Sequence, residues 1–381
     1  MADLRFLRRD GLSAAIGETT SQREIWLTIA PQPGEPSLPA QLVSIYRQMR
    51  DFLAELNLSD HVIVQERIFT ADPAGARNIA LACRSQYFPQ LSQIAPLAGL
   101  TIIGQAPGDK NRLIESQFHC LSYPDPAPEV LVDYQNEFTT RVIPPGPGRL
   151  SEIYLMNVIE PRPETPGAMF ALAGAALARH GFSFADVVRT WIYLPDIAAD
   201  YAQLNRVRNA FFERQNLTSL PASTGIGGRH PRPDTRWFLD LYAVRGLPPG
   251  SIAPMHTETL NEAPEYGARF SRGMALRQPE RTLLYLSGTA SIDEKGQTAH
   301  MGDIAAQLER TLLNLERLLR NQDVGWERLV LATCYLKHAA FLPLFWDSWR
   351  RRGLERVPVN LTQCPICRPE LLCEIEAVAF I

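Results

Sequence analysis

The chain has 381 residues, 45% hydrophobic and 21% charged, which is the composition of a globular protein, and its length suggests two or three domains. Its formal net charge of -3 gives no electrostatic reason to expect a polyanionic partner, so we do not expect it to bind nucleic acid. Residues 1–15 lack the apolar run of a signal peptide, and no later run has the length of a membrane span, so we expect a cytoplasmic protein without membrane contact.

Segments rich in Pro and Gly divide the chain into three parts of similar size. They lie at 122–130, reinforced by 143–148, and at 245–254. Because such segments disfavour continuous helices and central strands, they are natural boundaries. We therefore expect three units, which span 1–130, 131–248 and 249–381.

The three parts share one order of predicted elements. Each contains a short run rich in Val, Ile or Leu that crosses a junction into an amphipathic stretch with helical spacing, at 60–88, 185–214 and 327–353. An earlier helix is predicted upstream of each, at 39–57, 165–181 and 302–322. Two strands are predicted downstream of each, at 100–105 with 112–121, 223–228 with 236–244, and 357–363 with 371–381. Strands also precede the helices, most clearly at 268–277 and 282–292.

This order predicts an α+β unit in which one sheet carries two helices on one face. The other face must be buried elsewhere, and three units in one chain can bury these faces against one another. The expected architecture is a pseudo-trimer with the sheets inside and the helices outside, and the interfaces between units are the natural clefts. Because the pseudo-trimer removes the need for trimerisation, we expect a monomer.

Six cysteines are too sparse in a chain of this length for a disulfide framework, so we expect free thiols. Cys364 and Cys367 form a single CxxC without a second CxxC or a paired histidine, so no metal site is expected. The motif precedes a strand instead of opening a helix, which also disfavours a redox site. The glycines of 223–228 precede a strand, so a phosphate-binding loop is not expected either.

The last strand carries the acids of interest. Strand alternation places Glu374 and Glu376 on one face. Aligning the repeats by their acids matches Glu374 with Glu115 and Asp240. A structural role, satisfying backbone or arginine groups at the interfaces, is the interpretation we favour for Glu115 and Asp240.

The sequence resembles the RidA (YjgF) fold, whose members are homotrimers with ligand sites between subunits. The segments 185–210, 220–228, 327–349 and 371–381 carry this resemblance. The RidA arginine that holds a substrate carboxylate falls near Asn360, which argues against imine or enamine deamination. More narrowly, the middle and last units resemble the chorismatases, single chains that release pyruvate from chorismate. The stretches 193–212, 220–228, 265–273, 285–292, 301–319 and 367–378 carry this second resemblance.

The chorismatase resemblance implies a cofactor-free site between the middle and last units, with chorismate as a small-molecule substrate. Glu374 falls at the position of the catalytic glutamate, where a carboxylic acid would protonate the enol ether. Arg272 and Arg368 are candidate ligands for the substrate carboxylates, because a guanidinium binds a carboxylate with two hydrogen bonds. Tyr266 and Tyr193 are further candidate contacts, each with a structural role as the alternative.

The resemblance also implies a product. Cys367 and Gly288 match two positions that line the substrate pocket, and a Gly and Cys pair resembles the branch that makes 3-hydroxybenzoate by an intramolecular route. Two alternatives stay open: the hydrolase branch, which gives a cyclohexadiene diol, and a non-catalytic RidA-like protein that binds a small molecule.

Overall fold

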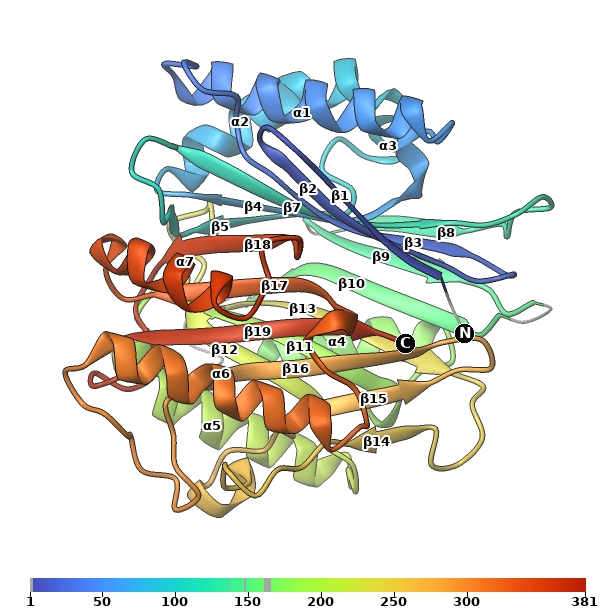
Figure 1. Cartoon of the computed structure of the whole chain (residues 1–381). Helices are drawn as coiled ribbons and strands as arrows, with labels where there is room; N and C mark the ends of the chain where they lie inside the picture. The colour runs from blue at the N-terminus through green and yellow to red at the C-terminus, as the bar shows by residue number, and fades with distance from the viewer. Residues whose placement is uncertain (1–2, 136, 147–148, 161–165) are drawn as a thin grey trace.

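The computed structural model describes residues 3–135, 137–146, 149–160 and 166–381, without the side chain of Tyr266. Thr165, where a helix of the middle unit is expected to begin, lies outside these residues. The described chain forms three mixed sheets, each with helices on its outer side (Figure 1). The predicted α+β architecture is therefore confirmed.

The first sheet has the strand order β1-β2-β3-β7-β4-β5. Its strands are β1 (Asp3–Arg9), β2 (Leu12–Glu18), β3 (Arg23–Ile29), β4 (Ile63–Thr70), β5 (Leu100–Gly104) and β7 (Ile114–Ser122). Helices α1 (Leu38–Glu55), α2 (Pro73–Tyr87) and α3 (Pro89–Ile94) belong to the same part of the chain. This first unit is weakest in sequence pattern, yet it builds a sheet of six strands.

The second sheet has the order β12-β11-β13-β10-β9-β8 and the third the order β14-β15-β16-β19-β17-β18-β6. The second consists of β8 (Leu131–Gln135), β9 (Phe138–Ile143), β10 (Ser151–Ile159), β11 (Val187–Leu194), β12 (Ala222–Gly227) and β13 (Phe238–Arg245), with α4 (Ala168–Arg179) and α5 (Ile197–Arg214). The third consists of β14 (Ile252–Pro254), β15 (Gly273–Arg277), β16 (Thr282–Ala290), β17 (Leu329–Leu336), β18 (Val359–Gln363) and β19 (Cys373–Phe380), with α6 (Ile304–Arg320) and α7 (Leu342–Arg350). The short strand β6 (Ala106–Pro107) comes from the first part of the chain and joins the two sheets.

Local sequence explains where the helices begin. Asp72, Asp196 and Asp303 each accept a hydrogen bond from the backbone N–H three residues later, which caps α2, α5 and α6. The Asp/Pro junction predicted in the first unit is therefore a helix start: Asp72 is the cap, and Pro73 takes the first helical position.

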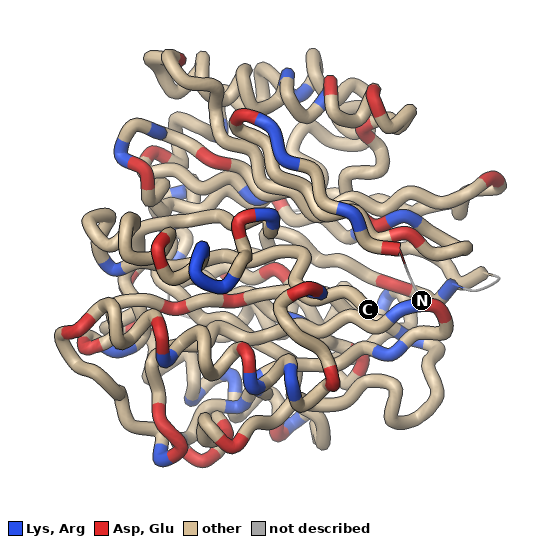
Figure 2. Tube along the Cα trace, in the orientation of Figure 1, with Lys and Arg blue, Asp and Glu red and all other residues tan. Residues whose placement is uncertain are grey.

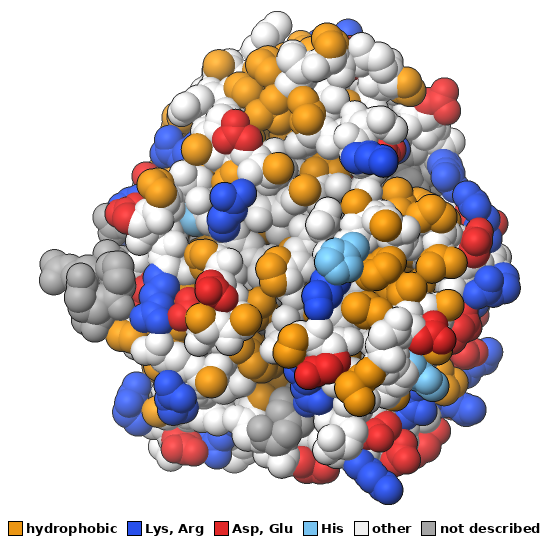
Figure 3. All heavy atoms as spheres, turned by 90° about the vertical axis from the view of Figure 1, so that its left-hand side faces the viewer, with side chains coloured by type: hydrophobic (Ala, Val, Ile, Leu, Met, Phe, Trp, Pro, Cys, Tyr) orange, Lys and Arg blue, Asp and Glu red, His pale blue; other side chains and the backbone are white. Residues whose placement is uncertain are grey.

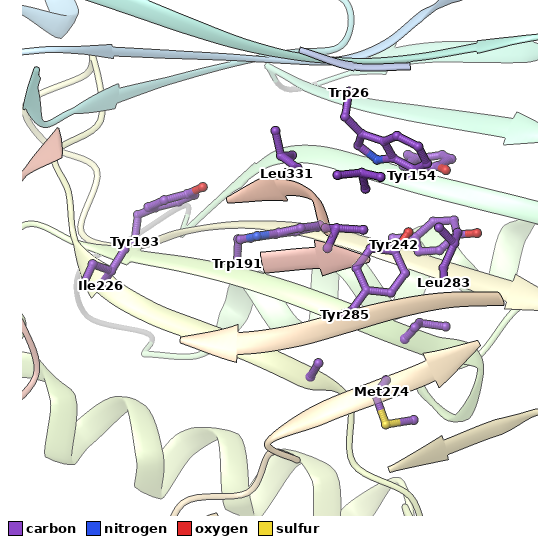
Figure 4. Packing of buried hydrophobic residues seen from close by; sticks show 14 of the residues in the cluster. Trp26, Tyr154, Trp191, Tyr193, Ile226, Tyr242, Met274, Leu283, Tyr285 and Leu331 are labelled. Carbon is purple, nitrogen blue, oxygen red and sulfur yellow. The ribbon is translucent and has the colours of Figure 1, made fainter. Parts of the chain in front are cut away.

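The space between the three sheets is a hydrophobic core. Aromatic side chains from all three sheets meet there, among them Trp26, Trp191 and Tyr285 (Figure 4). Three further clusters fill the space between each sheet and its own helices. The sheets thus bury one face against one another and the other against helices, as the repeat predicts.

Charged residues of both signs are interspersed over the outer helices and loops, without a surface region dominated by one sign (Figure 2). Figure 3 shows one face of the molecule, on which apolar side chains alternate with charged ones. Among the described residues no helix is both long and apolar enough to span a membrane.

The central strand pairs of the three sheets have the same register. β4 with β7, β11 with β13, and β17 with β19 run antiparallel, and each pair has an irregularity near its start. Phe69, Tyr193 and Tyr335 are equivalent in these pairs, and they lie opposite Glu115, Phe238 and Glu374. The alignment of Asp240 with Glu374 was therefore wrong by two residues, because it followed the acids in the sequence and not the strand register.

In this register Gln117, Asp240 and Glu376 are equivalent, and each side chain bonds to the next sheet. Gln117 donates to Thr333 Oγ1 at 3.2 Å, Asp240 accepts from Arg67 Nε at 3.2 Å, and Glu376 accepts from Trp191 Nε1 at 3.1 Å. Thr333, Arg67 and Trp191 are themselves equivalent residues. The pseudo-threefold arrangement thus extends to single side-chain contacts at the centre of the molecule.

Candidate active site

A cavity of about 420 Å³ lies between the second and third sheets. The second part of the chain contributes the inner face of α5 and the strand β12, and the third contributes β16, β19 and the loops that precede β15 and β19. The lining residues are Ala198, Tyr201, Ala202, Asn205, Arg208, Ser223, Gly225, Phe270, Arg272, Gly288, Ala290, Ile292, Cys367, Arg368, Leu371 and Glu374. The cavity thus lies at the interface where the sequence predicts a site.

Glu374 lines this cavity from β19, and only 5% of the residue is exposed. Burial, with the nearby charge of Glu376, raises the pKa of Glu374 to about 8, although Arg189 and Arg272 act in the opposite direction. The carboxyl group therefore carries its proton at neutral pH. A buried, protonated carboxylic acid at the wall of a cavity is suited to donate a proton.

Three guanidinium groups surround the same cavity. Arg272 lies one residue before β15 and donates from Nε to the carbonyl of Asn261 at 2.7 Å and from Nη2 to its side-chain oxygen at 2.9 Å. Arg368 donates to the carbonyl of Gly296 at 2.8 Å. Arg208, on α5, donates to Asn205 Oδ1 at 2.6 Å. These contacts fix the orientation of each planar group, so the cavity is prepared for an anionic ligand.

Phe270 forms an apolar wall beside two of these cations. The guanidinium carbon of Arg208 lies 5.2 Å from the centre of its ring, and that of Arg272 lies 5.6 Å away. These are cation–π distances. The cavity therefore combines an aromatic surface with positive charge, which suits a cyclic carboxylate.

Gly288 lies beside Glu374, at an irregularity in the pairing of β16 with β19. A Cβ atom at this position would lie 2.0 Å from Glu374 Oε1 and 3.1 Å from Thr224 Cγ2. The backbone N–H of Gly288 donates to Thr224 Oγ1 at 3.0 Å, which fixes this part of β16 against β12. Glycine at 288 thus makes room for the carboxyl group.

The cysteines are free in the structure. Burial raises the pKa of Cys367 to about 12 and that of Cys364 well above the usual range. Both are therefore neutral thiols near pH 7 and weak nucleophiles. Cys367 lines the cavity as a wall, and the described residues include no group of three His, Cys, Asp or Glu side chains arranged to hold a metal ion.

The structure brings five of the seven predicted residues together, namely Glu374, Arg272, Gly288, Cys367 and Arg368. Tyr193 does not line this cavity. It lies in the core between the sheets, where its ring stacks on Phe238 with centroids 4.7 Å apart. Tyr266 ends a short 3₁₀ helix, Ala263–Tyr266, and its side chain lies outside the described part.

Sequence reasoning missed Tyr201 and Arg208. Both lie on the inner face of α5, seven residues apart, which is two helical turns. A signal was present, because Arg208 interrupts the apolar stripe formed by Leu204, Phe211 and Phe212 and is only 2% exposed. A cation on the buried face of an amphipathic helix points to a partner or a ligand.

Comparison with known proteins agrees with this arrangement. The family model described as Endoribonuclease L-PSP matches residues 260–381. A solved structure of a chorismatase superposes with a TM-score of 0.67 at 17% identity, covering 95% of this chain and 100% of the other. The chain has the chorismatase fold.

Curated relatives extend the likeness to sequence. The chorismatase of Streptomyces rapamycinicus is 28% identical over 219 residues, which are 51% of this chain and 64% of that protein. The match therefore spans somewhat less than two thirds of that chorismatase. The 3-aminoacrylate deaminase RutC of Acinetobacter baylyi is 26% identical over 100 residues, 26% of this chain and 79% of that protein. The resemblance to chorismatases with a RidA-like fold is confirmed.

Proposed function

We propose that the protein releases pyruvate from chorismate in the cavity between the second and third sheets, with Glu374 as the general acid. The observation that carries this proposal is a protonated carboxyl group, that of Glu374, in a cavity lined by three arginines. A chorismatase is also the solved structure and the curated relative described above. Chorismate has two carboxylates and a ring, which match the cations and the aromatic wall.

The proposed reaction begins with a proton transfer. Glu374 gives its proton to the methylene carbon of the enolpyruvyl ether, and the adjacent carbon becomes an oxocarbenium-like centre. The carboxylate left on Glu374 then stabilises this positive charge or takes up a proton later in the reaction. Arg208, Arg272 and Arg368 hold the substrate carboxylates, so that the methylene carbon faces Glu374.

We propose 3-hydroxybenzoate as the second product. Pyruvate and 3-hydroxybenzoate together contain all the atoms of chorismate, so this route consumes no water. The hydroxyl group of the ring must then reach the cationic centre before water does. Gly288 and Cys367 support this route, because both line the cavity and neither is a charged or strongly hydrogen-bonding side chain that would hold a water molecule.

Incubation of the purified protein with chorismate tests the proposal directly. We expect pyruvate in a coupled lactate dehydrogenase assay and an equal amount of 3-hydroxybenzoate by chromatography. Pyruvate with a non-aromatic diol would assign the protein to hydrolysis. Binding of chorismate without pyruvate release would contradict catalysis and leave a protein that only binds small molecules.

A further inference from the structure

A buried ion pair lies between the central core and the cavity. Arg189 on β11 and Glu376 on β19 are 2% and 6% exposed, and Arg189 Nη2 lies 2.6 Å from Glu376 Oε2. Arg189 Nη2 also donates to Thr224 Oγ1 at 2.6 Å. Trp191 Nε1 donates to the other oxygen of Glu376 at 3.1 Å. Both charged groups are therefore held in fixed places across the interface between the second and third sheets.

This pair is connected to Glu374 by two routes. Glu376 follows Glu374 by two residues on one strand, so both side chains leave the same face of β19. Through Thr224, which also accepts the backbone N–H of Gly288 at 3.0 Å, Arg189 is connected to the strand segment against which the Glu374 carboxyl packs. The pair thus influences Glu374 through both charge and position.

Comparison of the three units separates this pair from the general pseudo-threefold contacts. The position of Glu376 bonds to the next sheet in every unit, so that contact alone is architectural. The position of Arg189 differs, because its equivalents by strand register are Gln65 and Leu331, which carry no charge. The additional cation is therefore present only at the interface that contains the cavity with Glu374.

We propose that Arg189 and Glu376 are positioning residues that keep Glu374 as a proton donor by presenting it with a fixed pair of opposite charges. The catalytic meaning of this role rests on the proposed function. Glu376 opposes ionisation of Glu374, and Arg189 favours it and holds Glu376 in place. Removing either member alone would leave the other buried charge uncompensated.

Other groups also face Glu374. Arg272, Arg208 and Arg368 line the cavity, and Tyr335 lies opposite Glu374 on β17. Cys364 and Cys367 are nearby as neutral thiols, because burial raises the pKa of each. None of these groups changes charge near pH 8, so they form a constant background for the titration of Glu374.

The test is the titration of Glu374 itself, followed by infrared difference spectroscopy of the protonated carboxyl band. The band is assigned by its loss in Glu374→Gln made in each background. For Glu376→Gln we expect the midpoint to fall by about one pH unit or more, because only the cation remains. For Arg189→Gln we expect it to rise by about as much, and for the double variant to return towards the native value.

Two controls separate this role from a merely structural one. Arg189→Lys retains the charge and should leave the midpoint near the native value. Asp240→Asn, at the position equivalent to Glu376, should lower the thermal stability without moving the midpoint. Shifts of Glu376→Gln and Arg189→Gln in the same direction, or no shift, would overturn the proposal. The titration requires no turnover, so it remains decisive even if chorismate is not the substrate.

Discussion

The clefts between the three sheets are equivalent in register but differ in content. Between the second and third sheets, Glu374 lines a cavity of about 420 Å³. Between the third and first sheets, the equivalent Glu115 lines a cavity of about 120 Å³ and is paired with Arg112. Burial raises the pKa of Glu115 as well, although Arg112 opposes this. The same fold position thus holds a carboxyl group facing a cavity in one cleft and an ion-paired one in another.

The third cleft is closed. Between the first and second sheets the equivalent residue is Phe238, which packs on Tyr193 and on His230. A cavity of about 10 Å³ remains near this place, lined by residues that include Leu100, Ile102 and Asn157. An acid, an open cavity and several cations occur together in one of these three clefts, which teaches that the fold alone does not produce the site.

The largest expected effect separates the two acids. Glu374→Gln removes the proposed proton donor and should lower pyruvate release by a factor of about 10² to 10⁴. Glu115→Gln makes the same change in the equivalent cleft and should leave the rate close to that of the native protein. Steady-state kinetics on both variants provide the comparison, and equal losses in the two would refute the assignment of the site to one cleft.

Closing of the third cleft should appear as stability. Phe238→Ala removes a fully buried ring and should lower the free energy of unfolding by about 3 to 5 kcal/mol. Leu113→Ala, at a residue that is 42% exposed, should change it by less than about 0.5 kcal/mol. Urea unfolding measures both. If Phe238→Ala were as stable as Leu113→Ala, the ring would not be what closes this cleft.

Space beside the acid can be tested at Gly288. The methyl group of Gly288→Ala would overlap Glu374 Oε1, so the carboxyl must move, and a displacement of this size costs about 100-fold in rate. Gly225→Ala is the matched control in the same cavity, since its Cβ would be 3.5 Å from Tyr201, an ordinary contact. The control should lose far less activity. Combined with Cys367→Ala, Gly288→Ala should also shift the product towards the diol.

A smaller effect is expected at the cations. Arg208→Met removes a charge-assisted hydrogen bond to the substrate carboxylate, worth about 1.5 to 3 kcal/mol, so KM should rise about 10- to 100-fold. Arg112→Met, beside Glu115 in the equivalent cleft, should leave KM unchanged. A KM for Arg208→Met equal to that of Arg112→Met would exclude Arg208 as a substrate ligand.

Much of the site could be predicted from the sequence, because Glu374, Gly288 and Cys367 lie on segments whose pattern shows both the strand and the family resemblance. Arg208 was missed because it approaches from a helix of another unit, and sequence spacing does not show which helix face meets a cleft. Asp240 was misaligned because an irregularity in strand pairing and a two-residue shift of the acid are invisible without the register. Tyr193 was selected by its place in a strand, yet strand alternation alone does not distinguish the central core from the cavity.

The pH dependence of kcat/KM for pyruvate release tests the central claim most directly. Because the folded-state pKa of Glu374 is raised to about 8, the acid form predominates below that pH and is lost above it. The same shift means that the stability which the protonated group contributes is full below pH 4.5 and is lost as the pH rises towards 8. We predict a rate that is constant from pH 6 to 7 and falls about tenfold per unit well above pH 8. A rate that rises through pH 8, or stays level to pH 10, would contradict Glu374 as the acid.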